Sequence, residues 1–135
     1  VFSRLLCIKA PYFGSIRPLF LKLEPGFCAI SIRKRRSVHN HLGTVHAIAM
    51  CNMAELAGGV MTEVSVPTTM RWIPVGMQVR YLKMAKSGLV AEARLAEGVD
   101  LSQSGENQVK VDVKDAHGEL VFDAIITMRV SAKKS

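Results

Sequence analysis

The sequence predicts an α+β protein in which one antiparallel sheet of five to six strands wraps around one long buried helix. Residues 47–61 are almost wholly apolar, and Asn52 and Glu55 are their only strongly polar side chains. Such a composition is typical of a helix that is buried on all sides. Short apolar segments with alternating or β-branched residues lie before and after this helix, separated by turn residues, which indicates the strands of one sheet.

The elements are expected in a simple order along the chain. Residues 1–9 resemble a short amphipathic helix that Pro11 and Gly14 end. The long helix should begin near Thr44 or Val45 and fade at residues 61–63, before Pro67. Strands are expected at residues 19–23, 27–33 (a second strand or a continuation of the first), 69–73, 77–85, 89–97, 109–115 and 120–130. Turns or breaks are expected at residues 24–26, 74–76, 86–88 and 116–119, and a loop at 98–107.

Length and composition predict one domain over residues 1–135. The chain is 49% hydrophobic and 21% charged, which excludes a disordered protein. No apolar run reaches the length of a membrane span. The cysteines Cys7, Cys28 and Cys51 have no spacing typical of a disulfide framework or a metal site, which favours packing roles and a reducing, cytoplasmic location.

The net charge of +7 predicts an anionic partner. Nucleic acid, an acidic membrane surface and a phosphate-bearing metabolite all carry such charge. Nucleic acid is disfavoured because the chain has no recognisable reader motif and only 6% aromatic residues. The basic run Arg33–Arg36 is either a solvated strand end or a phosphate-binding segment, since guanidinium groups match phosphate geometry.

A set of spaced residues surrounds the start of the long helix: Asn40, Gly43-Thr44, His46 and Glu55. This pattern resembles the hotdog fold of acyl-CoA thioesterases, in particular the phenylacetate-pathway (PaaI-type) enzymes. In that family an Asn and a His precede a catalytic Asp or Glu that lies nine residues after the His. The amino-acid sequences of residues 10–13, 54–59 and 71–74 resemble those of an uncharacterised bacterial branch of the same superfamily, a domain of unknown function.

The resemblance implies a hydrolase with Glu55 as base or nucleophile, Asn40 holding the attacking water or the thioester carbonyl, and His46 in an orienting role. The peptide N–H groups of His46 and Ala47 would bind the oxygen anion at the helix N-terminus. The family usually has His-Gly-Gly where this chain has His46-Ala47-Ile48. We expect these side chains to narrow the approach of a thioester, and we expect Glu55 itself to be enclosed, because its helix is apolar.

The resemblance also implies a coenzyme A thioester as substrate, with no further cofactor and no metal. The helix face of Glu55 and two bulky residues of later strands would line an acyl groove, and two cations would bind the CoA phosphates. These expected substrate-binding residues are Ile48, Cys51, Gly59, Trp72, Met77, Arg80 and Lys83.

Several alternatives remain open from the sequence. Glu55 could pair with a buried Arg or Lys or serve a dimer contact, Cys51 could be a catalytic thiol, and Trp72 and Met77 could be ordinary core residues. The protein could bind an acyl-CoA or fatty acyl ligand without turnover, or could be a 3-hydroxyacyl dehydratase using His41 and Glu55. Because an antiparallel sheet has free edges, we expect a homodimer or a dimer of dimers, that is, a homotetramer.

Overall fold

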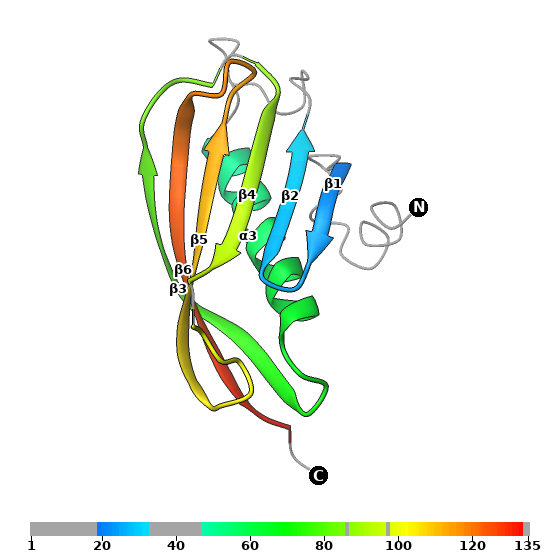
Figure 1. The fold of residues 1–135 in the computed structure, drawn as a ribbon. Coiled ribbons are helices and arrows are strands. Elements are labelled where there is room, and N and C mark those ends of the chain that lie inside the picture. The colour runs from blue at the N-terminus through cyan, green and yellow to red at the C-terminus, as the bar shows by residue number, and fades with distance from the viewer. Residues whose placement is uncertain (1–18, 33–46, 86, 97, 134–135) are drawn as a thin grey trace.

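The predicted architecture is present in the computed structural model, which describes residues 19–32, 47–85, 87–96 and 98–133. These residues form one six-stranded antiparallel sheet and one long helix, so the predicted fold class is confirmed (Figure 1). The elements are β1 (Leu19–Glu24), β2 (Phe27–Ile32), α3 (Ala47–Ser65), β3 (Met70–Tyr81), β4 (Leu89–Leu95), β5 (Gly105–Lys114) and β6 (Leu120–Ala132).

The strand order leaves two edges that are far apart in the sequence. The order is β1-β2-β4-β5-β6-β3, and every neighbouring pair is antiparallel. Strand β3, which follows α3 in the chain, is therefore not beside β2, which precedes α3. It lies at the edge of the sheet opposite β1. This arrangement places β3 as a free edge strand beside the C-terminal β6, as Figure 1 shows.

Helix α3 lies across one face of the sheet, here called the inner face (Figure 1). It packs mainly against β4, β2 and β5, and less against β6 and β3. Small residues permit the close approach: Ala54, Ala57 and Gly58 of the helix are all buried. A Cβ added at Gly58 would lie 2.9 Å from Cδ1 of Ile126 on β6, so the backbone of the helix lies directly against this side chain.

The core consists of apolar side chains from the helix and from alternating strand positions of the inner face. This alternation follows from the pleat, which directs successive side chains to opposite faces. The largest fully buried side chains are Ile30, Met53, Leu56, Met61, Leu89, Val109, Val111, Val113, Phe122, Ile126 and Met128.

Strand β3 differs from the prediction, which divided it into two strands at residues 74–76. It is one continuous strand of 12 residues with a register shift. Pro74 pairs with Met128 and Gly76 pairs with Thr127, so Val75 is an extra residue opposite no partner. A bulge of this kind bends a strand and resets its alternation. As a result Trp72 and Met77, five residues apart, both face α3.

The outer face of the sheet carries charged side chains around one buried acid. Asp123 on β6 is only 3% exposed. Arg80 donates two hydrogen bonds to its carboxylate, of 2.9 and 2.5 Å, and Lys110 donates one of 2.9 Å. The hydrogen bonds from Arg80 are the main reason that the pKa of Asp123 is lowered to about 2, against the opposing effect of burial.

Several smaller predictions can be compared with these elements. The turn at residues 24–26 is confirmed, and Gly26 has φ of 86°, a conformation that favours glycine. Strand β4 ends at Leu95 rather than at residue 97, and β5 begins at Gly105, inside the segment predicted as a loop. The helix predicted at residues 1–9 and the start of the long helix near residue 44 lie outside the described residues. Among the residues that are described, no helix combines the length and apolarity that a membrane span requires.

Candidate functional site: a groove between the helix and the edge strand

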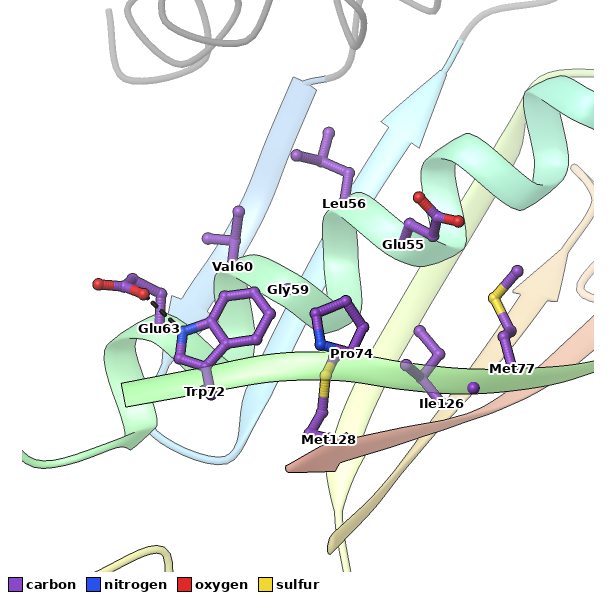
Figure 2. Close-up of a pocket in the computed structure, with 11 residues that line it drawn as sticks. Glu55, Leu56, Gly59, Val60, Glu63, Trp72, Pro74, Met77, Ile126 and Met128 are labelled. Carbon is purple, nitrogen blue, oxygen red and sulfur yellow. Dashed lines mark hydrogen bonds between the residues drawn. The ribbon is translucent and has the colours of Figure 1, made fainter. Parts of the chain in front are cut away.

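A groove with a volume of about 570 Å³ lies between α3 and β3. This volume is within the range of pockets that bind small molecules. Its walls are mostly apolar, and Figure 2 shows the helix residues on one side and the strand residues on the other. The lining residues are Glu55, Leu56, Gly59, Val60 and Glu63 of α3, Trp72, Pro74, Gly76 and Met77 of β3, and Ile126 and Met128 of β6.

The position of α3 explains why the groove exists. The helix packs mainly over β4, β2 and β5, so it does not fully cover the edge strand. Two side-chain hydrogen bonds join α3 to β3 across this gap. Sγ of Cys51 and Oη of Tyr81 are 3.3 Å apart, and Nε1 of Trp72 donates to Oε2 of Glu63 at 2.6 Å. Cys51 lies one helical turn before Glu55, and Glu63 is the last residue of α3 that lines the groove, so a hydrogen bond joins helix and strand near each end of the groove.

Glu55 lies at one end of the groove and is exposed in the single chain, so the expectation of an enclosed acid is wrong. The physical reason is the orientation of α3. Its opposite face packs on the sheet, and no element of the described chain lies beyond the edge strand β3 to cover this side. In Figure 2 the carboxylate is near Met77, whereas Glu63 and Trp72 lie at the other end.

The structure brings four of the predicted site residues together. Glu55, Gly59, Trp72 and Met77 all line the groove. Gly59 has a specific steric role, since a Cβ at this position would lie 3.3 Å from Cη2 of Trp72. The groove is therefore the place where the predicted acid and the predicted acyl-binding residues meet, and their roles in substrate binding stay predictions.

Arg80 and Lys83 are not brought to this groove. Arg80 faces the outer side of the sheet, three residues from the inward-facing Met77, and its guanidinium group is bound to Asp123. Lys83 forms an ion pair with Glu119. Neither geometry supports the predicted binding of CoA phosphates, because each cation already has a carboxylate partner.

Cys51 is on the helix face of Glu55 as predicted, but it is not among the residues that line the groove. Its contact with Tyr81 raises the pKa of the Tyr81 hydroxyl, chiefly through the hydrogen bond and then through burial. The other described cysteine, Cys28, is fully buried, and burial raises the pKa of its thiol to about 11. The thiol of Cys28 is therefore protonated at neutral pH, and Cys28 is a core residue.

The remaining predicted site residues cannot be placed. Asn40, His46 and the basic run Arg33–Arg36 lie outside the described residues. Ala47 is the first residue given for α3, and Ile48 follows it, but the side chains of both lie outside the described part as well. Within the described ranges, no group of three or more His, Cys, Asp or Glu side chains could hold a metal ion.

The groove also contains residues that the sequence did not indicate. Val60 and Glu63 lie four and seven residues after Leu56, in a row beside that of Glu55 and Gly59, so the helix period could have identified them. Ile126 and Met128 could not have been identified, because alternation on β6 does not reveal which face meets the helix.

Comparison with known families decides where this chain belongs. A family model described as a domain of unknown function, DUF4442, matches residues 1–130. The chain belongs to the DUF4442 family. No curated protein matches this DUF4442 protein in sequence.

Several solved structures have a fold similar to that of the DUF4442 protein. The structural-genomics target APC5556 shares 46% sequence identity with a TM-score of 0.91, over 98% of this chain and 88% of that chain. A thioesterase from Haemophilus influenzae shares 12% identity with a TM-score of 0.82, covering 95% and 87%. A thioesterase family protein from Silicibacter pomeroyi shares 14% identity with a TM-score of 0.81, covering 97% and 96%. The DUF4442 protein therefore shares the fold of these thioesterase structures, the hotdog fold.

Proposed function

We propose that the protein hydrolyses the thioester bond of an acyl-CoA, with Glu55 as the base or the nucleophile. The observation that carries this proposal is the position of Glu55 at the end of an apolar groove of about 570 Å³. An apolar groove suits an acyl chain, and a carboxylate at its end suits the reacting carbonyl. The similarity in fold to structures named as thioesterases supports the same reaction class.

The proposed chemistry is ordinary hydrolysis. As a base, Glu55 takes a proton from a water molecule whose oxygen attacks the thioester carbon, the carbon–sulfur bond breaks, and the coenzyme A thiolate takes up a proton. As a nucleophile, the carboxylate attacks the thioester carbon and expels the coenzyme A thiolate, which takes up a proton, and water then hydrolyses the resulting anhydride to the free acid and the Glu55 carboxylate. In both routes the N–H groups at the start of α3, with His46 and Asn40, are the candidate donors for the developing oxygen anion.

We propose further that a second copy of the chain completes the site. Glu55 is exposed, and β3 is an edge strand of the sheet that the described residues form, so one side of its backbone can pair with another strand. Its neighbourhood exposes large apolar side chains: Ile73 and Tyr81 are 58% and 54% exposed, and Val75, Leu82 and Met84 are exposed as well. Pairing of two copies along this edge would cover these side chains and enclose Glu55. A cytoplasmic location is part of the proposal, because the described cysteines are free thiols.

Hydrolysis of a panel of acyl-CoAs by the parent protein and the Glu55→Gln variant tests the assignment. Gln preserves the size of the side chain and removes its basicity, so we expect turnover to fall by at least about 10²-fold while the fold is unchanged. Glu106→Gln is the control, since Glu106 is an exposed acid bound to Arg129 on the outer face. Equal rates in the parent and the Glu55→Gln variant would exclude this catalytic role.

A non-catalytic acyl-binding protein is the second candidate, and the apolar groove by itself favours it equally. The same panel separates the two functions. Tight binding of acyl-CoAs by the parent protein without any release of free coenzyme A would support the binding protein over the thioesterase.

A further inference from the structure

Trp72 lies at the end of the groove that is opposite Glu55 (Figure 2). Its indole lies beside Glu63 and next to Gly59 in Figure 2. The ring nitrogen Nε1 donates a hydrogen bond of 2.6 Å to Oε2 of Glu63. The far edge of the ring meets the helix at Gly59, where an added Cβ would be 3.3 Å from Cη2. Trp72 is therefore held at its polar edge by an acid and at its apolar edge by the helix backbone.

The two constraints on the ring are independent of each other. A hydrogen bond from an indole to a charged carboxylate is stronger than one between neutral groups. Gly59 has no side chain, which is why the ring can lie directly on α3. Gly is an unfavourable residue in the interior of a helix, so its presence at this position is explained by the space that the indole requires.

The helix sets the distance between the acid and this aromatic end. Glu55 and Glu63 are eight residues apart on α3, which corresponds to about 12 Å along the helix axis. Because an extended acyl chain zigzags and advances by only about 1.25 Å per C–C bond, roughly ten carbon atoms span that length. The residues between the two ends are apolar: Leu56 and Val60 on the helix, and Met77 on the strand.

We infer that Trp72, held by Glu63 and seated on Gly59, is the end wall of the groove and sets the longest acyl chain that the site accepts. This inference rests on the proposed function and names its substrate class, straight acyl chains of medium length. A chain that is shorter than the groove leaves Trp72 untouched. A chain that is longer must displace the indole, break its hydrogen bond to Glu63, or leave methylene groups in water.

Rates of hydrolysis for saturated acyl-CoAs from butanoyl to hexadecanoyl test the wall. In the parent we expect kcat/KM to rise roughly fourfold for each added methylene while the chain fits, and to stop rising once the chain reaches Trp72. In Trp72→Ala the rise should continue to longer chains, because the wall is removed. Glu63→Ala should shift the limit in the same direction by a smaller amount, and Gly59→Ala should shorten it by pressing on the ring.

Fluorescence gives a second measurement that needs no turnover. Trp72 is the only tryptophan of the 135 residues, so intrinsic emission reports on the wall alone. With the Glu55→Gln variant, we expect binding of decanoyl-CoA to change the emission and binding of butanoyl-CoA to leave it unchanged. Trp72→Phe is the conservative variant if Trp72→Ala does not fold. It keeps an apolar ring but is smaller and loses the N–H donor, so its chain-length limit should lie between those of Glu63→Ala and Trp72→Ala.

The outcomes separate this inference from the proposed function. If acyl-CoAs are hydrolysed but the parent, Trp72→Phe and Glu63→Ala have identical chain-length profiles, the wall is overturned and the thioesterase stands. Emission that changes equally with butanoyl-CoA and decanoyl-CoA also overturns the wall. If no acyl-CoA is bound or hydrolysed by the parent, both proposals fail.

Discussion

Arg80 and Asp123 form a bidentate ion pair that joins the edge strand β3 to its neighbour β6. The two hydrogen bonds are 2.9 and 2.5 Å long, and the carboxylate is almost fully buried. Lys110 of β5 binds the same carboxylate from the other side. Three adjacent strands therefore meet at one acid on the outer face, and the attachment of the edge strand depends partly on its ionisation.

This pair predicts a specific loss of stability in acid. The pKa of Asp123 is lowered to about 2 in the folded protein, from an ordinary value near 3.8. The ionised carboxylate therefore contributes to the free energy of unfolding above about pH 4, and this contribution is lost as the pH falls toward 2. Because solvent screens the exposed Arg80, the contribution is at most about 2 kcal/mol. Urea unfolding of the parent and Asp123→Asn from pH 6 to 2.5 measures it, and the difference between them should shrink below pH 4.

Asp112→Asn is the matched control for this measurement. Asp112 is opposite Asp123 on the neighbouring strand, but its ion pair to Lys110 is long at 3.6 Å and its side chain is 27% exposed. We expect a much smaller change. A difference between the parent and Asp123→Asn that is constant from pH 6 to 2.5 would contradict the predicted role of ionisation.

Gly58 and Ile126 predict a non-additive pair of substitutions. Gly58→Ala gains about 1 kcal/mol in helix propensity, but the new methyl would collide with Cδ1 of Ile126. Val109 and Val111 surround the same point at 3.5 and 3.7 Å, so Ile126 has little room to move. We expect the variant to be less stable than the parent by about 1 kcal/mol, since overpacking costs more than the propensity gain.

A double-mutant cycle identifies the cause. Ile126→Val removes the colliding carbon and by itself should cost about 1 kcal/mol. In the Ile126→Val background, Gly58→Ala should become stabilising, as measured by thermal or denaturant unfolding. Strict additivity of the two substitutions would show that the close approach of α3 to β6 does not limit residue 58.

The contact between Cys51 and Tyr81 predicts a shift in tyrosine titration. The pKa of Tyr81 is raised, first by its hydrogen bond to Cys51. In a Tyr12→Phe background Tyr81 is the only tyrosine, because the chain has two, and its ionisation can be followed by ultraviolet absorbance. Cys51→Ala should move this titration to lower pH, toward the ordinary value near 10. An unchanged titration would mean that the contact is not maintained in solution.

The exposed edge strand predicts which substitution prevents association. Ile73 on β3 and Leu19 on β1 are both 58% exposed, at opposite edges of the sheet. We expect Ile73→Lys to shift the protein toward monomers in analytical ultracentrifugation and to lower the rate of Glu55-dependent hydrolysis, while Leu19→Lys leaves both unchanged. Equal effects of the two substitutions would argue against association through β3.

The fold could be predicted from the sequence because each element has a local signal. The apolar run of residues 47–61 identified α3, and the turn residues 24–26 separated β1 from β2. An irregularity is present at residues 74–76, but it is not the predicted gap between two strands. Pro74 and Gly76 mark a bulge inside one strand. A local pattern does not reveal whether the chain continues to pair with the same partner across such a point.

For the candidate site, the sequence alone identifies the residues that share one face of α3. Glu55 and Gly59 share a helix face, and both line the groove. The exposure of Glu55 was missed because the apolar helix suggested enclosure, whereas the edge of the sheet leaves one side of α3 open. Nothing in the sequence connects Arg80 with Asp123, 43 residues later, so the sequence alone leaves Arg80 available for phosphate binding.

The extra residue Val75 predicts what a deletion in β3 would do. Deleting Val75 would remove the bulge and force one half of the strand to turn over. Either Trp72 would then point toward the charged outer face, or Arg80 would be carried inward and away from Asp123. Insertions and deletions are usually tolerated in loops, but here a chain one residue shorter would keep the same topology and lose its groove.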